Sequence, residues 1–354
     1  MIVKIGDVIS EYSVRNKFDE NIPVYSVTNE KGFCTGYFSK EVASKDKSTY
    51  KIVPRGYFAY NPSRINVGSV DWQKYEDRVI VSPLYVVFGV SDRLDRQYLL
   101  HYLKSDMMLS FIKEYATGSV RDSLKLADLG KFPINLRPLE EQCQIAAILD
   151  KIDDLIAKRR QQLDKLNELE KSRFIEMFGD PVTNSKGLVT RKGSEFFTLT
   201  NGKFVPEEKR RDEGIPAYGG NGISWYTDEI LVAHDTIVVG RVGFQSGNVH
   251  FVTGPLWVTD NAMYISDFNK DQYDLRFLCA LMEHIDFTRF QDAGDLKKIT
   301  QKPFMQMSFI APPIQQQKSF ITFVEQVDKS KLAIQRILDK LEVLKKALMQ
   351  EYFG

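Results

Sequence analysis

The stretch PLEEQCQIAAILDKIDDLIAKRRQQLDKLNELEKSRFIEMFG at Pro138–Gly179 recurs as PIQQQKSFITFVEQVDKSKLAIQRILDKLEVLKKALMQEYFG at Pro313–Gly354. The two copies align without a gap, so the offset from Pro138 to Pro313 holds at every position. Identities include Asp164-Lys165-Leu166 with Asp339-Lys340-Leu341, and Phe178-Gly179 with Phe353-Gly354. A match of this length in one register indicates an internal duplication.

Each copy predicts one long helix, because no proline or glycine lies between its opening proline and its closing glycine. Apolar residues recur at alternating steps of three and four, which is typical of a heptad seam between helices that pack lengthwise. The predicted seam residues are Ile145, Leu149, Ile152, Ile156, Leu163, Leu166, Phe320, Val324, Val327, Ile334, Leu338 and Leu341.

The simplest partner for one helix is the other copy. A globular segment separates the two copies, so we expect an antiparallel pair. Polar residues interrupt the seam at Arg159, Glu170, Lys331 and Lys345, where they could set the register. The alternative is that each helix covers only its own half of the chain.

Composition limits the kind of protein. The 354 residues can hold two ordinary domains, and 48 basic against 47 acidic residues confine any DNA site to a local patch. No apolar run is long enough to span a bilayer, and the start lacks the pattern of a signal peptide, so we expect a cytoplasmic protein without a membrane partner. Three distant cysteines and four scattered histidines suggest neither a disulfide framework nor a metal site.

The regions before the two helices have mixed character. Short β-rich runs, such as DRVIVSPLYVVFGV from Asp77 and DTIVVGRVGFQSGNVHFV from Asp235, alternate with turn clusters. One amphipathic helix follows in each half, in which Asp95 matches Asp274. The expected fold is α+β. Two mixed α/β domains, 1–137 and 180–312, are joined by two long antiparallel coiled-coil helices, 138–179 and 313–354, in a pseudo-two-fold repeat.

These residues together resemble the specificity subunits of type I restriction-modification enzymes. In the second half the resemblance rests on IPAYGGNGISWYTDEIL, DTIVVGRVGFQSGNV and GPLWVTDNAMYI, and in the first half on IPVYSVTNEKGF, YNPSRINVGS, GSVRDSL and RPLEEQ. The resemblance implies two target-recognition domains that read a bipartite sequence in double-stranded DNA. It also implies a helix pair that sets the spacer and docks two methyltransferase subunits, and it leaves open whether restriction subunits join them.

The same resemblance implies no catalytic residue and no cofactor in this chain, with S-adenosylmethionine bound on the methyltransferase partner. Two rival functions are an enzyme and a scaffold that only dimerises through its helices. The NPSR sequence at Asn61 lacks the aromatic residue of an adenine-gripping motif, and neither a glycine-rich cofactor loop nor a GxxxxGK[ST] loop is present. A dimerising scaffold would explain the helices but not the turn-rich halves.

Candidate DNA contacts lie in the turns. Arg241 stands in GRVGFQSG, where backbone can approach a duplex, and we take Arg64, after Tyr60 and Asn61, as its counterpart. Tyr218, Asn221 and Trp225 offer hydrogen bonds and stacking faces, with core packing as the alternative. Just before the long helices, Arg121, Lys125, Lys297 and Lys298 are candidates for phosphate contacts, with a solvated loop as the alternative.

Overall fold

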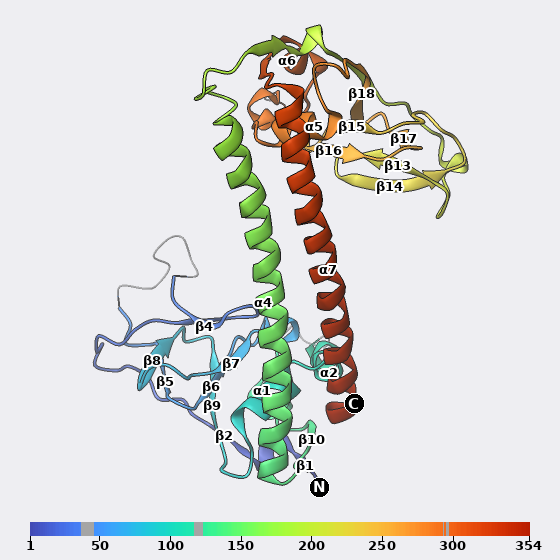
Figure 1. The fold of residues 1–354 in the computed structure, drawn as a ribbon. Coiled ribbons are helices and arrows are strands. Elements are labelled where there is room, and N and C mark those ends of the chain that lie inside the picture. Colours follow the sequence, from blue (N-terminus) through green and yellow to red (C-terminus); the bar gives the residue numbers. More distant parts are fainter. Residues whose placement is uncertain (37–45, 117–122, 293, 295–296) are drawn as a thin grey trace. The chain divides into compact units, whose positions relative to one another are not determined.

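A computed structural model describes residues 1–36, 46–116, 123–292, 294 and 297–354. The chain divides into two compact units. Unit 1 comprises Met1–Arg160 and Arg336–Gly354, and unit 2 comprises Gln161–Gln335. Two 40-residue helices, α4 (Leu139–Phe178) and α7 (Ile314–Phe353), each contribute residues to both units (Figure 1).

Unit 1 holds short strands and three short helices besides its parts of α4 and α7. Its strands are β1 (Ile2–Lys4), β2 (Ile9–Glu11), β3 (Ser26–Thr28), β4 (Gly32–Cys34), β5 (Lys51–Pro54), β6 (Phe58–Tyr60), β7 (Val70–Trp72), β8 (Arg78–Val81), β9 (Val86–Val90) and β10 (Pro133–Asn135). Its other helices are α1 (Arg96–Leu103), α2 (Asp106–Ala116) and α3 (Leu126–Leu129), with 3-10 turns η1 (Ile5–Asp7) and η2 (Ile65–Val67).

Unit 2 has a similar order of elements. Its strands are β11 (Thr190–Lys192), β12 (Phe197–Asn201), β13 (Ile215–Gly219), β14 (Gly222–Thr227), β15 (Thr236–Gly240), β16 (Val249–Val252), β17 (Trp257–Val258), β18 (Ala262–Phe268) and β19 (Ser308–Ile310). Its other helices are α5 (Leu275–Glu283) and α6 (Gln301–Gln306), with 3-10 turns η3 (Gly193–Glu195), η4 (Glu207–Lys209) and η5 (Phe287–Phe290).

The central sheet is the same in both units. Its strand order is β2-β9-β6-β7 in unit 1 and β12-β18-β15-β16 in unit 2, and every pairing is antiparallel. The outer strands differ, because unit 1 adds the pairs β3-β4 and β5-β8 where unit 2 adds the three-stranded sheet β14-β13-β17. The duplication seen in the helices therefore includes the central sheet, and the two units diverge in their outer strands.

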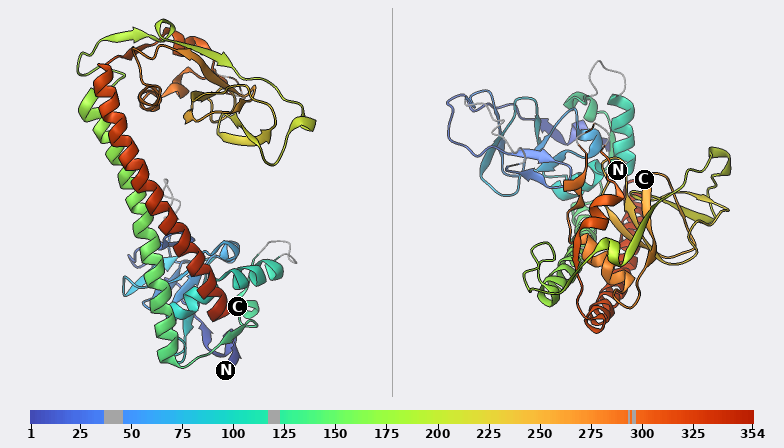
Figure 2. Two further views of the ribbon diagram at one scale, coloured as in Figure 1. Left: turned by 45° about the vertical axis from the view of Figure 1, so that its right-hand side comes forward. Right: turned by 90° about the horizontal axis from the view of Figure 1, so that it is seen from above.

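Within each unit, α4 and α7 lie side by side (Figures 1 and 2). In unit 1, Asp153 pairs with Lys345 at 2.5 Å and Arg160 pairs with Glu342 at 2.8 Å. Residue numbers rise along one helix as they fall along the other, so the helices are antiparallel, as expected. In unit 2 the polar interruption Glu170 pairs with the interruption Lys331 at 2.7 Å.

The predicted seam residues are all at least partly buried. Seven are buried, namely Ile145, Leu149, Ile152, Ile156, Phe320, Val327 and Leu338. Half-buried positions are Leu163, Leu166, Val324, Ile334 and Leu341. The first turns also pack on the globular part of each unit, since Ile145 and Leu149 join the unit 1 core and Phe320 joins the unit 2 core. Each helix thus both pairs with the other and covers its own half.

A buried glutamine fastens the start of each long helix. The side-chain carbonyl of Gln142 accepts the Asp95 N–H at 2.8 Å, and its amide donates to the carbonyls of Arg93 and Arg137 at 3.0 and 2.8 Å. Asp95 in turn caps α1 by accepting the Tyr98 N–H at 2.8 Å. The same arrangement recurs at the start of the second helix.

In unit 2 the equivalent residue is Gln317. Its carbonyl accepts the N–H of Asp274, the cap of α5, at 2.9 Å, and its amide donates to the carbonyls of Gln272 and Pro312 at 2.9 and 2.8 Å. A buried amide with every strong group satisfied fixes one geometry. The two glutamines therefore orient each long helix on the globular part of its unit.

Candidate DNA interface

The loop at residues 240–248, between β15 and β16, is closed by its own backbone. Gly240 donates to Asn248 at 2.8 Å, Gly247 donates to Gly240 at 2.8 Å, and Ser246 donates to Gly243 at 3.1 Å. Gly243 and Gly247 adopt φ values of 88° and 97°, which other residues rarely adopt. The glycines of the motif thus serve to form a tight, self-supported loop, which we call the 240–248 loop.

Arg241 is fixed at the base of this loop. Its N–H donates to the Asn261 carbonyl and its own carbonyl accepts the Ile299 N–H, both at 2.9 Å. One guanidinium nitrogen, Nη1, donates to the Asp260 carbonyl at 3.2 Å, and the side chain is half-buried. The guanidinium is held beside the loop and keeps further donors for a ligand.

The turn between β13 and β14 lies against the same loop. A Cβ atom on Gly220 would stand only 3.1 Å from the Gly240 Cα, so a larger residue would crowd this approach. Turn and loop together border a cleft of about 570 Å³. It is lined by Phe204, Val205, Arg210, Gly219, Gly220, Asn221, Ser224, Trp225, Val242, Phe244, Gln245, Thr259, Asp260 and Asn261.

Three predicted residues of the β13-β14 hairpin have different surroundings. Asn221 is exposed and lines the cleft. Trp225 also lines it, but the Arg210 guanidinium lies 5.3 Å from the centre of its ring and covers part of it. Tyr218 is half-buried and packs on the cluster around Val238 and Val258. Of the three, Asn221 is the most accessible to a ligand.

A second cleft, of about 590 Å³, lies in unit 1. It is lined by Ser26, Val27, Thr28, Asn29, Glu30, Lys31, Asn61, Arg64, Val67, Ser69 and Tyr85. Arg64 is exposed, while Asn61 accepts the Ser63 N–H on its side-chain oxygen at 3.1 Å and so folds the turn. Tyr60 is 0% exposed and its hydroxyl donates to the Leu124 carbonyl at 3.1 Å. The expectation that Tyr60 touches DNA is therefore wrong, since it is a core residue.

Arg64 is not the structural counterpart of Arg241. The hydrogen bond from the Asn61 N–H to the Ser69 carbonyl corresponds to the bond from the Gly240 N–H to the Asn248 carbonyl. The residue numbers of the two bonds differ by the same amount as those of the equivalent residues Asp95 and Asp274. Likewise, the Leu124 N–H donates to the Pro62 carbonyl at 3.1 Å, as Ile299 does to Arg241. Pro62 therefore occupies the place of Arg241, and Arg64 occupies that of Gly243.

The lysines before the long helices flank these loops. In unit 2 the carbonyl of Lys297 accepts the Gly243 N–H at 2.8 Å, and Lys298 pairs as an isolated bridge with Val242. In unit 1, Lys125 follows Leu124 and precedes α3. All three lysines are exposed, which suits phosphate contacts. Arg121, the fourth predicted cation, lies outside the described residues.

Sequence reasoning missed several cleft residues. The most prominent is Phe244, which is 91% exposed at the tip of the 240–248 loop. Phe204 and Arg210 line the same cleft, and Thr28, Asn29 and Lys31 line the one in unit 1. The signal for Phe244 was present in the sequence GFQSG, where an aromatic residue stands between glycines that leave it little to pack on.

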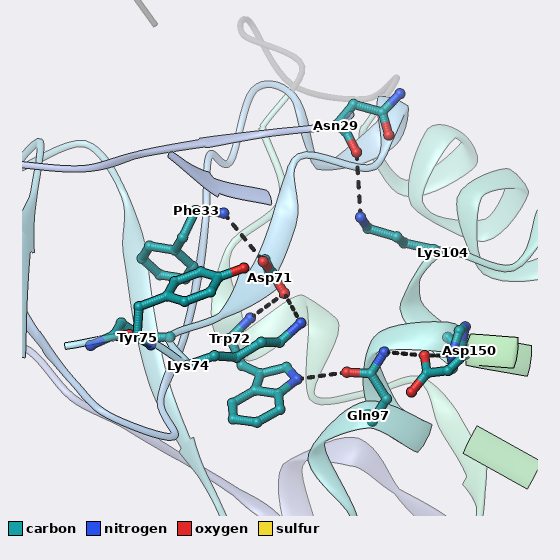
Figure 3. Close-up of polar contacts among 11 residues, drawn as sticks. Asn29, Phe33, Asp71, Trp72, Lys74, Tyr75, Gln97, Lys104 and Asp150 are labelled. Carbon is teal, nitrogen blue, oxygen red and sulfur yellow. Dashed lines mark hydrogen bonds and ion pairs between the residues drawn. The ribbon is translucent and has the colours of Figure 1, made fainter. Parts of the chain in front are cut away.

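A polar network links the central sheet of unit 1 to its helices (Figure 3). Trp72, at the end of β7, donates its indole N–H to Gln97 of α1 at 2.9 Å. Gln97 donates onward to Asp150 of α4 at 2.6 Å, and His101 also contacts this carboxylate at 2.8 Å. Partial burial raises the pKa of Asp150, but these hydrogen bonds outweigh it and hold the pKa below its usual value.

Unit 2 makes the same connection with other residues. Arg276 of α5, equivalent to Gln97, lies 4.8 Å from the ring of Phe251 in β16 and 3.6 Å from Glu325 of α7. A second link in unit 1 joins the end of α1 to the cleft, because Lys104 donates to the Asn29 carbonyl at 3.4 Å. Burial lowers the pKa of Lys104.

Two kinds of feature are absent from the part of the chain that is described. No three His, Cys, Asp or Glu side chains there are grouped so as to hold a metal ion. Among the same residues, no helix is both long and apolar enough to cross a membrane.

Two domains of one sheet topology, each with a cleft beside exposed cations, define a protein with two recognition domains. Residues 2–168 and 185–345 each match the family model for the type I restriction modification DNA specificity domain. The chain belongs to this family, the specificity subunits of type I restriction-modification systems. These subunits recognise DNA and are not catalytic.

Individual relatives are distant. The putative type I restriction enzyme MjaX specificity subunit of Methanocaldococcus jannaschii is 22% identical over 350 residues, which cover 88% of this chain and 80% of that protein. The type I restriction enzyme EcoprrI specificity subunit of Escherichia coli is 23% identical over 276 residues, which cover 73% of this chain and 64% of that protein.

Solved structures support the fold. The S subunit of a type I restriction-modification system from M. genitalium has a TM-score of 0.65 at 16% identity, with 100% of this chain and 96% of that chain covered. A structure concerned with complex assembly and conformational transition of the type I R-M system has a TM-score of 0.54 at 16% identity, covering 100% and 97%.

Proposed function

We propose that the chain reads a bipartite DNA sequence, with residues 1–137 and 180–312 as its two target-recognition domains. The observation that carries this proposal is a shared central sheet with different outer strands and different clefts. A common scaffold with divergent binding surfaces suits two half-sites of different sequence. Because the halves are related by a pseudo-two-fold repeat, the half-sites face opposite directions.

The contacts divide into two kinds. Lys125, Lys297 and Lys298 bind phosphates and so set the position on the duplex. Asn221, Arg241 and Gln245 in unit 2, and Asn61 and Arg64 in unit 1, offer donors and acceptors for base edges in a major groove. The buried Thr259 hydroxyl supports the unit 2 assignment, since it lines the cleft with no hydrogen-bond partner among the described residues.

We propose the partners that the resemblance to the family implies. The paired helices dock two methyltransferase subunits, which carry S-adenosylmethionine, and restriction subunits join this assembly when cleavage is its output. We place the complex in the cytoplasm, where its DNA lies. A scaffold that only dimerises is disfavoured, because α4 and α7 already pair within one chain.

Methylation mapping tests the proposal directly. Methylated adenines are mapped in cells with the chain, with the chain deleted, and with it restored. We expect one bipartite motif whose methylation disappears on deletion and returns on restoration. A methylation pattern indifferent to the chain would refute sequence reading.

The second test concerns the spacer. Inserting seven residues, roughly two helical turns, in register into both α4 and α7 preserves the seam and lengthens the pair. We expect the methylated motif to keep both half-sites and to gain base pairs between them. The control inserts seven residues into α4 alone, which should disrupt pairing and abolish methylation. An unchanged spacer after the double insertion would contradict the role of the helices as a ruler.

A further inference from the structure

Phe244 has an exposure that packing does not explain. It lies three residues before Gly247, and the equivalent residue in unit 1, three before Gly68, is Ile65. Gly68 and Gly247 both adopt positive φ, so the two loops share this feature of their backbone. Yet Ile65 is 1% exposed in the core, whereas Phe244 is 91% exposed. Unit 2 presents to solvent an apolar group that unit 1 buries.

The loop that carries Phe244 is held firmly. Besides its internal hydrogen bonds, it rests on η5, where a Cβ atom at Gly247 would lie 3.2 Å from the Phe287 Cβ. Its Gly243 N–H is tied to the Lys297 carbonyl. An aromatic group on a rigid support loses little conformational freedom on binding, which favours a direct contact with a ligand.

The surroundings indicate what that ligand is. Polar side chains that suit base edges, Asn221, Gln245 and Asn261, line the same cleft as Phe244. Lys297 and Lys298 flank the loop, so a DNA backbone held by them brings bases to the phenyl ring. Apolar side chains of some DNA-binding proteins insert between base steps and partly unstack them, a mode best known from proteins that bind the minor groove.

We propose that Phe244 inserts as an apolar wedge into one base step of the half-site read by unit 2. This inference rests on the proposed function. Unit 1 has an isoleucine turned inward at this position, so the wedge belongs to one half-site only. Insertion is easiest at flexible pyrimidine–purine steps, which makes such a step a specificity element of that half-site.

The test compares Phe244→Ala and Phe244→Trp in the full chain purified with its methyltransferase partner. The probe is a duplex carrying the mapped motif, with 2-aminopurine at successive positions of each half-site. Besides the adenines that the methyltransferase flips out of the duplex, we expect wild type to raise the fluorescence at one further step, in the half-site read by unit 2, because unstacking relieves quenching. Phe244→Ala should abolish that signal and weaken binding about 5- to 100-fold, with Trp close to wild type. The salt dependence should not change, since no phosphate contact is lost.

The matched control is Phe18→Ala, which removes a phenyl group that is 88% exposed in unit 1. Phe18→Ala should leave the 2-aminopurine signal in the half-site read by unit 2 unchanged. Both alanine variants should have the same melting temperature as wild type. The inference is overturned if Phe244→Ala keeps wild-type affinity and fluorescence, or if it instead loses capture of the methyltransferase, which would make Phe244 a protein contact. Wild type that does not discriminate the mapped motif would overturn the proposed function itself.

Discussion

At the scale of single residues, the two units use the same positions for different chemistry. Trp72, Gln97 and Asp150 make a hydrogen-bonded chain where Phe251, Arg276 and Glu325 make a cation–π contact and an ion pair. Gln142 and Gln317, by contrast, are identical and make the same three bonds. The glutamines that orient the long helices are the same in both units, whereas the residues that link the central sheet to the helices have diverged.

Arg241 provides a test of domain-wise reading. Arg241→Ala removes a guanidinium held beside the unit 2 cleft, and we expect recognition to weaken about 10- to 100-fold at one half-site. Competition with duplexes altered in one half or the other measures this. Equal losses at both half-sites would contradict separate reading by the two units.

Gln317→Ala tests the fastening of α7. It leaves the Asp274 N–H and two carbonyls without partners in a buried place, so we expect a loss of about 3 kcal/mol in the free energy of unfolding. The exposed neighbour Gln316 is the matched control, and Gln316→Ala should change little. Urea denaturation compares the two, and a similar stability for both variants would show that water replaces the lost bonds.

At the scale of elements, the helix pair carries an ion pair inside its seam. Lys331 contacts Glu170 at 2.7 Å and Asp328 at 3.7 Å, and the first of these contacts is largely buried. Partners of this kind fix register more clearly than they add stability, because desolvation offsets their attraction.

A double-mutant comparison separates these two contributions. Lys331→Met strands Glu170, and we expect it to cost about 2 kcal/mol, whereas Lys331→Met with Glu170→Leu should recover most of that loss. Lys329→Met, at an exposed site nearby, is the control. Chemical denaturation of the four chains gives the values. If the double variant were no more stable than Lys331→Met, the pair would be a true source of stability.

Much of the helix pair was predictable from the sequence, because its apolar residues recur periodically. The seam and the helix bounds follow from the heptad spacing and from the constant offset between the two helical copies, and the antiparallel pairing follows from the globular segment that separates them. The candidate DNA contacts were less predictable. Equivalent residues of the two central sheets are further apart in number than equivalent residues of the two long helices. Matching arginine to arginine therefore paired Arg64 with Arg241, which is not its structural counterpart. Neither the burial of Tyr60 nor the exposure of Phe244 follows from periodicity, since both depend on which strand or loop lies opposite.

At the scale of the whole molecule, the chain holds two units, and each has its own central sheet with the same strand order. The order of the central strands recurs from unit 1 to unit 2, while the outer strands change from two pairs to one three-stranded sheet. Such an arrangement lets one recognition domain change without disturbing the other, because the divergent strands and clefts of each lie within a single unit.

The division of α4 and α7 between the units also bears on synthesis. Unit 2 is one uninterrupted segment, Gln161–Gln335, whereas unit 1 needs Arg336–Gly354 as well as Met1–Arg160. A ribosome therefore finishes every residue of unit 2 before it makes the segment that completes unit 1. Unit 1 is therefore the first to be started and the last to be completed. Its completion brings the ring of Phe353 to 5.1 Å from the ring of Tyr98, measured between centroids.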